Sequence, residues 1–515
     1  MNRPPPSAGI TARRPHCIPQ TIKAIGMTCL PRFALGTVRS GCCGRLMLWA
    51  LLESLSRRGI STQLFHSRAC FPRNDGAMAI TGLRPRHLDS WLMRPDLCRE
   101  FFRHGSRCGE LSLVEGFFQP ADQATAGRRH GGGLSALCDW LDLPRLVIID
   151  ASQLGLCRLP PRPANVDGLL LDRLSGREDF FRQQTTLQSL WGIPVLGGLP
   201  EAPALREAAR HLAPGDEPPR KLIDALGDLL AANIRIDRIR QIAESRPAEP
   251  KQSRPAEPKQ QSRPAEPKQQ SRPVEPTRHV RHDRPMLHPR CCRNIRVAVA
   301  FDEAFHDYFP DTLDLLETIG AEVVDFSPLH DESLPPSIDL VYFGGGHPER
   351  FAAELSSNHC MTMALQCHLH QGRRMYAEGG GLAYLCRYLE LPSGELVPMI
   401  GALPAVARRN AMPQTPQPLT ATLRRDSWLG KQGSQIRGYL NSAWIIEPVG
   451  QLSSLAAEPQ RQYDLVEHRG TIGSRIHVNF AAQSELLRHL SLVGRPPTDR
   501  PGSMGSEAQI RLSDR

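Results

Sequence analysis

The chain has 515 residues, of which 40% are hydrophobic and 23% charged, a balance typical of two or three ordinary globular domains. Its longest apolar stretches, such as residues 46–52, are far too short to span a bilayer, so we expect no membrane partner and a cytoplasmic location. The net charge of +10 is modest for this length, and we interpret it as a basic surface without a nucleic-acid partner.

The first part of the chain predicts a parallel α/β domain. Residues 1–27 are rich in Pro and Arg and predict a disordered extension. Between residues 28 and 242, short apolar runs alternate with segments of helical periodicity, which predicts a mostly parallel sheet covered by helices on both faces. The expected strands are residues 32–36, 111–114, 146–150, 168–171 and 194–199, and the expected helices include 46–57 and 186–191.

A proline-rich repeat follows this domain. The unit Ser-Arg-Pro-Ala-Glu-Pro-Lys begins at Ser245, Ser253 and Ser262, and a variant begins at Ser271. Two prolines per unit prevent a helix, so residues 243–293 predict an extended, polyproline-like linker, with binding of an SH3-like partner as the alternative. A second α/β pattern then starts with an expected strand at 295–300 and runs from 294 to 490, and residues 491–515 predict a disordered tail.

Histidines and cysteines are densest between residues 359 and 370. They are His359, Cys360, Cys367, His368 and His370. Their spacing matches no zinc-binding pattern, and we interpret them as buried thiols and one face of a helix.

Motifs in both domains carry a resemblance to a known family. In the second domain they are residues 297–305, 320–322, 326–329 and 342–349, the last ending in Gly-Gly-Gly-His-Pro-Glu; in the first they are residues 88–91, 113–116 and 197–200. Over residues 28–242 and 294–483 the chain resembles the cobyrinic and hydrogenobyrinic acid a,c-diamide synthases. The resemblance implies a P-loop NTPase-like, dethiobiotin synthetase-type parallel-sheet domain, with residues 88–91 in a helix, followed by a class I glutamine amidotransferase-like α/β domain.

The resemblance also implies a chemistry. Such carbon–nitrogen ligases of cobalamin biosynthesis bind ATP and Mg²⁺ at a P-loop and phosphorylate a side-chain carboxylate of a tetrapyrrole or corrinoid acid. Ammonia released from glutamine at a second site then displaces the phosphate.

The glutaminase motif of the family, Tyr-Ala-Glu-Cys-Gly-Gly-Leu, has glycine in place of cysteine here, at Gly379. Glycine has no nucleophile, so covalent attack on glutamine is excluded at this position, while the positive φ expected at such an elbow suits glycine. The resemblance makes His477 the catalytic histidine and places Gly345 and Gly346 at the oxyanion hole. Because position 379 has no thiol, we expect these two glycines to form only a turn. Cys386 is expected two helical turns further on, out of reach.

The candidate nucleotide-binding residues are Gly36, Ser40, Gly41, Gly44 and Arg45. This stretch can be aligned with a P-loop in two registers, and neither of them places a lysine and a hydroxyl where a P-loop requires them. In one register Arg45 and Leu46 stand at those two positions, and in the other Gly44 takes the lysine position. Glu115 is the one expected metal-facing acid.

Three hypotheses follow. The first is a degenerate homologue that binds a tetrapyrrole or an active relative without catalysing the reaction. The second is a working amidoligase that uses free ammonia. The third is a decayed gene product without function.

Overall fold

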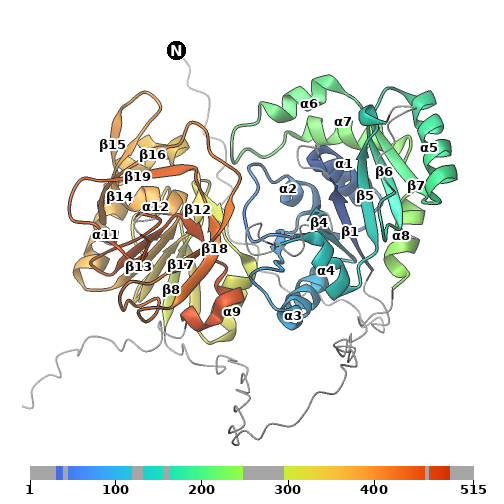
Figure 1. Ribbon diagram of the computed structural model, residues 1–515. Coiled ribbons are helices and arrows are strands. Elements are labelled where there is room, and N and C mark those ends of the chain that lie inside the picture. Colours follow the sequence, from blue (N-terminus) through green and yellow to red (C-terminus); the bar gives the residue numbers. More distant parts are fainter. Residues whose placement is uncertain are drawn as a thin grey trace, which may run out of the picture.

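A computed structural model describes residues 31–38, 44–118, 132–154, 162–246, 295–458 and 463–487. It shows two α/β bodies side by side (Figure 1). The predicted terminal extensions, residues 247–293 of the predicted linker, and the candidate residues Ser40 and Gly41 lie outside the described residues. Among the described residues, no helix is both long and apolar enough to cross a membrane.

The first body is built on a seven-stranded sheet of order β3-β2-β4-β1-β5-β6-β7. Its strands are β1 (Arg32–Thr37), β2 (Thr62–His66), β3 (Arg86–His87), β4 (Leu111–Phe117), β5 (Arg145–Asp150), β6 (Gly168–Leu174) and β7 (Val195–Pro200). Every neighbouring pair is parallel, which confirms the predicted sheet.

Helices cover both faces of this sheet, as predicted. They are α1 (Gly44–Ser56), α2 (Ala77–Thr81), α3 (Pro95–Gly105), α4 (Leu134–Leu141), α5 (Arg177–Trp191), α6 (Pro203–Arg210), α7 (Arg220–Ala231) and α8 (Ile236–Glu244), with short 3₁₀ turns η1 (Ser106–Cys108) and η3 (Ala151–Gln153). Successive strand residues alternate between the two cores: Phe33 and Leu35 pack with α1, α7 and α8, whereas Ala34 packs with α3, α4 and α5. The helix expected at residues 88–91 is absent; a turn held by the Asp89 carboxylate takes its place, because the backbone N–H groups of Trp91 and Leu92 donate to it.

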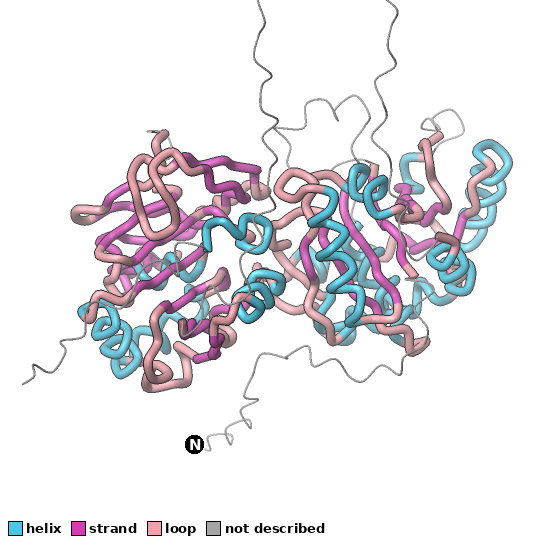
Figure 2. Tube along the Cα trace, turned by 90° about the horizontal axis from the view of Figure 1, so that it is seen from below, coloured by secondary structure: helices cyan, strands magenta, loops and turns pink. Residues whose placement is uncertain are grey.

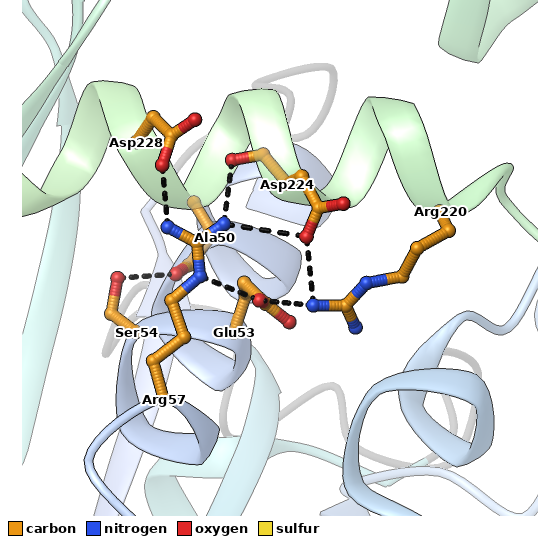
Figure 3. A network of polar contacts seen from close by, with 7 residues as sticks. All are labelled: Ala50, Glu53, Ser54, Arg57, Arg220, Asp224 and Asp228. Atoms are coloured by element: carbon orange, nitrogen blue, oxygen red, sulfur yellow. Dashed lines mark hydrogen bonds and ion pairs between the residues drawn. The ribbon is translucent and has the colours of Figure 1, made fainter.

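A buried carboxylate joins α1 to α7 (Figure 3). Glu53 is fully buried, and its Oε1 accepts hydrogen bonds from Arg57 at 2.7 Å and from Arg220 at 2.5 Å. Arg57 also pairs with Asp224 and Asp228 on α7. The two arginines therefore compensate a charge that burial alone would disfavour.

We expect Arg57→Ala to lower the free energy of unfolding by about 1–3 kcal/mol, because Glu53 then keeps only one of its two donors. The matched control is Arg58→Ala, since the neighbouring Arg58 pairs with the exposed Asp237 at 3.4 Å and should change stability by less than about 0.5 kcal/mol. Urea unfolding of both variants measures the difference, and equal effects would contradict the role given to Glu53.

The second body contains a second seven-stranded sheet of order β10-β8-β11-β13-β22-β21-β20. Its strands are β8 (Arg296–Ala300), β10 (Glu322–Phe326), β11 (Leu340–Phe343), β13 (Arg374–Glu378), β20 (Ser453–Ser454), β21 (Leu465–His468) and β22 (Thr471–Ser474). The five strands from β10 to β22 are parallel, and β21 and β20 continue the sheet in antiparallel pairs.

Among its described residues, the second body also contains three smaller sheets and four helices. The strands are β9 (Phe305–Asp307) with β12 (Gly345–Gly346); β14 (Cys386–Glu390), β15 (Leu396–Pro398), β16 (Leu403–Arg409) and β19 (Trp444–Pro448); and β17 (Gln417–Thr422), β18 (Gln435–Leu440) and β23 (Ile476–His477). The helices are α9 (Pro310–Thr318), α10 (Ala352–Ser357), α11 (His359–His370) and α12 (Gly380–Leu385), with 3₁₀ segments η4 (Pro348–Phe351) and η6 (Phe480–Leu487).

The structure corrects two expectations about cysteines. Cys360 and Cys367 lie on α11 as expected of a helix face, but both are exposed and not buried. Cys386 does not continue a helix: α12 ends at Leu385, and Cys386 begins β14 with its thiol donating to the carbonyl of Leu382. No group of three or more potential ligands among the described residues forms a metal site.

The two bodies contact each other directly, and the view from below shows them again side by side (Figure 2). Arg86 of β3 pairs with Asp311 and Asp314 of α9, and the Arg86 and Asp311 side chains are each only 5% exposed. Arg437 of β18 donates to the backbone carbonyl of Trp91 at 3.2 Å. These two contacts are polar, and the pair of Arg86 and Asp311 is buried.

Candidate functional site

Gly379 forms a tight elbow between β13 and α12. Its φ of +51° and ψ of −111° confirm the predicted positive φ, a conformation that side-chain-bearing residues rarely adopt. A Cβ at this position would lie 3.2 Å from Cε1 and 3.6 Å from Nε2 of His477, and 3.3 Å from Nδ2 of Asn441. The structure thus brings the expected nucleophile position and His477 together, with room for a short side chain once its neighbours shift by a few tenths of an ångström.

His477 is held by one partner at each ring nitrogen. Asn441 Nδ2 lies 2.9 Å from Nε2, and the amide orientation is fixed because Asn441 Oδ1 accepts from the N–H of Ala443 at 2.9 Å. An amide nitrogen can only donate, so Nε2 is the acceptor and Nδ1 carries the proton. Nδ1 then donates to Glu378 Oε2 at 3.3 Å. The nitrogen that faces Gly379 is therefore the one without a proton, and it accepts the hydrogen bond from Asn441.

Glu378 is itself fixed within the core. It is only 1% exposed, and its Oε1 accepts from the Tyr376 hydroxyl at 2.8 Å and from the backbone N–H of Val478 at 3.2 Å. Burial, with the nearby charge of Glu378, raises the pKa of Tyr376 well above its usual value, so the phenol stays a donor. A histidine oriented by a buried carboxylate is the arrangement of a general base.

Gly345 and Gly346 border the same site, although not as the expected turn. They form the short strand β12, which pairs with β9. A Cβ on Gly345 would lie 3.3 Å from Cε1 of His477, and one on Gly346 would lie 2.1 Å from the carbonyl oxygen of Ala304. Glycine is therefore needed here for the close approach of backbone to the ring and to the neighbouring strand.

Sequence analysis missed the two partners of His477. Glu378 directly precedes Gly379 in the quoted motif, so its position offered a signal. Asn441 lies one residue beyond β18 and reaches His477 only because β18 pairs with β23, a long-range contact without a local sequence signal.

The first body brings β1 and the start of α1 to a second centre. Gly36 lies so close to β4 that a Cβ would be 2.8 Å from the Gly116 carbonyl oxygen, and a Cβ on Gly44 would be 3.1 Å from Thr37. Arg45 stands at the lysine position of one register, and its guanidinium contacts other groups of the first body.

The Arg45 guanidinium contacts Oδ1 of Asn74 at 3.4 Å and the carbonyl of Ala209 at 3.3 Å, and lies 5.2 Å from the centre of the Trp49 ring. Leu46, at the hydroxyl position, is 1% exposed in the core. Neither residue supplies the ammonium or the hydroxyl that a P-loop offers to phosphate and magnesium.

Glu115, the expected metal-facing acid, is already engaged by a histidine. Nδ1 of His66 lies 2.6 Å from Glu115 Oε1, and Nε2 lies 3.0 Å from Asp75 Oδ2. Burial of the ring opposes its charge, but the hydrogen bonds and charges of Asp75 and Glu115 outweigh that effect and raise the pKa of His66 to about 10. Likewise, burial would raise the pKa of Asp75, yet His66 lowers it below its usual value. These residues do not fit a bound Mg²⁺, because the cation that balances the carboxylates is the histidine.

Cys70 lies in the loop that follows β2. Burial raises the pKa of Cys70 to about 12, so Cys70 remains a neutral thiol near pH 7.

A row of packed histidine and phenylalanine rings connects His66 in the first body with His477 in the second. His87 lies 5.1 Å from His66, and Phe71 lies 5.2 Å from His87 and 5.1 Å from His477, measured between ring centroids. Phe309 of α9 stacks on Phe71 at 4.7 Å. Burial, with the charge of His66, lowers the pKa of His87 well below its usual value, so this ring is neutral.

A second connection runs through Tyr439, which pairs with His477 in the register of β18 and β23. Its hydroxyl donates to Asp89 Oδ2 at 2.7 Å and accepts from the N–H of Gly132 at 2.9 Å, both in the first body. Burial raises the pKa of Asp89, an effect that hydrogen bonds from Ala69 and Tyr439 oppose. The strand that pairs with the histidine strand is thereby fixed to the turn at Asp89.

Comparisons with known proteins agree with this architecture. Residues 296–483 match the model of the CobB/CobQ-like glutamine amidotransferase domain. A cobyrinate a,c-diamide synthase of Dehalococcoides mccartyi (strain CBDB1) is 29% identical over 427 residues, which cover 80% of this chain and 85% of that protein. The cobyrinate a,c-diamide synthase of Salmonella typhimurium is 26% identical over 474 residues, 89% of this chain and 96% of that protein.

Two solved structures are similar to parts of this chain. A crystal structure of a glutamine amidotransferase covers 38% of this chain and 97% of its own, with a TM-score of 0.30 and 16% identity. A crystal structure of FtsY from Mycoplasma mycoides covers 42% of this chain and 66% of its own, with a TM-score of 0.22 and 13% identity.

Proposed function

We propose that this protein is a degenerate member of the cobyrinate a,c-diamide synthases, which keeps the fold without the glutaminase reaction. The proposal is supported by the match of residues 296–483 to the CobB/CobQ-like glutamine amidotransferase domain and by the similarity of 80–89% of the chain to cobyrinate a,c-diamide synthases. In this proposal residues 28–242 form a synthetase-type domain, residues 243–293 a linker and residues 294–490 the amidotransferase-like domain. The retained role is binding of a corrinoid or related tetrapyrrole acid, or of an active homologue.

The observation that carries the proposal is Gly379, which lies at the elbow beside His477. The elbow has the required backbone conformation, and His477 is buried, oriented by Glu378 and directed at the missing side chain. A base without a nucleophile cannot form the covalent intermediate through which a thiolate hydrolyses an amide.

The first centre supports the same proposal. Leu46 is in the core, Arg45 is occupied by protein groups, and Glu115 is paired with His66. We therefore propose that this protein does not hydrolyse ATP and does not use Mg²⁺, the two cofactors implied by the resemblance. The alternative, an amidoligase fed by free ammonia, is compatible with Gly379, but requires this first centre to work.

The purified full chain is expected to release no glutamate from glutamine above a protein-free blank, measured by a coupled glutamate dehydrogenase assay. The same preparation should change the visible absorbance of cobyrinic acid or a sirohaem-like tetrapyrrole on titration, with saturation at one equivalent. Release of glutamate would contradict the proposed loss of glutaminase activity. If no tetrapyrrole changes its absorbance on titration, the proposed tetrapyrrole binding is wrong, and binding of an active homologue is the remaining role.

A further inference from the structure

Asp75, Glu115 and His66 form a closed charged cluster at the carboxyl ends of β2 and β4. His66 and Glu115 are directly opposite in the register of these parallel strands, so the sheet itself sets their contact. Asp75 is fixed from the other side, because its Oδ1 accepts from the N–H of Ala77 at 2.9 Å. The His66 side chain is 7% exposed.

The contacts define the charge of the ring. Both ring nitrogens lie against carboxylate oxygens, at 2.6 Å for Glu115 and 3.0 Å for Asp75. An ionised carboxylate can only accept a hydrogen bond, and a neutral imidazole has only one N–H to donate. With both carboxylates ionised, two such contacts require the imidazolium, and each is a charge-assisted hydrogen bond.

We infer that His66 is a built-in cation, standing between Asp75 and Glu115 where a divalent metal ion would otherwise bridge them, so that this cluster excludes Mg²⁺. Two oxygens bound to one Mg²⁺ at about 2.0–2.1 Å lie no more than about 4.2 Å apart. Here the whole ring separates the two carboxylate oxygens, because a different nitrogen contacts each of them. The inference rests on the proposed function and deepens it, because the protein then lacks a Mg²⁺ site as well as the cysteine nucleophile.

Binding of Mn²⁺, used as the probe, tests this without any activity assay. Electron paramagnetic resonance would count free Mn²⁺ in a titration of the full chain up to about 1 mM metal, without nucleotide. We expect no stoichiometric site in the unaltered protein. His66→Ala should create one site whose dissociation constant lies at least about tenfold below the highest metal concentration of the titration, and adding Glu115→Gln to it should abolish that site.

His104→Ala is the matched control, because His104 is exposed and also contacts a carboxylate, Asp314, at 3.2 Å. It should gain no site. A site in the unaltered protein that disappears in Glu115→Gln would overturn the inference, as would a folded His66→Ala that gains nothing. His66→Gln, which keeps most of the side-chain volume, replaces His66→Ala if the latter does not fold; glutamate release remains a separate readout for the proposed function.

Discussion

Gly379→Cys is expected to create measurable glutaminase activity in a protein that otherwise has none. A Cβ at this position would lie 3.6 Å from Nε2 of His477, the nitrogen that is free of a proton in the hydrogen-bonding pattern with Asn441 and Glu378. A positioned base of this kind contributes about 10²–10⁴-fold to rate. We therefore expect glutamate release by Gly379→Cys to be at least about 100-fold faster than by the double variant in which His477→Ala is added.

The same substitution should destabilise the fold by about 1–3 kcal/mol, because φ at Gly379 is +51° and a side chain is strained there. Gly379→Ala is the matched control: it should lose similar stability and gain no activity. Adding His477→Ala to Gly379→Cys should remove most of the gained rate. If Gly379→Cys folds but releases no glutamate, the geometry around His477 is not that of a working base.

Arg86→Ala is expected to cost about 3–5 kcal/mol of unfolding free energy, the largest effect on stability that we predict. The substitution leaves Asp311 buried at 5% exposure without its guanidinium partner, and an uncompensated buried charge is strongly destabilising. Asp314 is less affected, because it is 35% exposed and keeps His104. Urea unfolding measures the loss, and hydrogen exchange should show faster opening of α9.

The exposed pair of Arg408 and Glu447, 2.8 Å apart, provides the control, and Arg408→Ala should cost less than about 1 kcal/mol. Combining Arg86→Ala with Asp311→Ala should recover part of the loss, because the second change removes the unpaired charge. An Arg86→Ala effect no larger than that of Arg408→Ala would mean that the two bodies do not depend on this pair.

The sequence predicted regular elements well where periodicity is strong. The parallel strands at β1, β5, β6 and β7 follow from apolar runs that are buried on both faces, a pattern that few other structures share. The segment 88–91 was predicted wrongly, because a resemblance placed a helix where the Asp89 carboxylate instead caps a turn and meets Tyr439 of the other body.

The candidate site could be predicted only in part, because some of its contacts join residues that are far apart in the sequence. Gly379 and His477 could be located from local motifs, whereas Asn441 and Asp75 reach their histidines through strand pairing and loop packing that no local pattern encodes. The role of His66 could not be predicted either, because it depends on the position of His66 opposite Glu115 in the sheet register. Contacts of this kind are set by the tertiary fold.

The most direct test of the central claim is an amidation assay that does not depend on the missing thiol. The full chain would be incubated with cobyrinic acid, ATP, Mg²⁺ and ammonium chloride, and the products separated by mass. Loss of both centres predicts unchanged cobyrinic acid and no ADP above a protein-free blank. Formation of a mono- or diamide with matching ADP would contradict the account and establish an ammonia-dependent ligase.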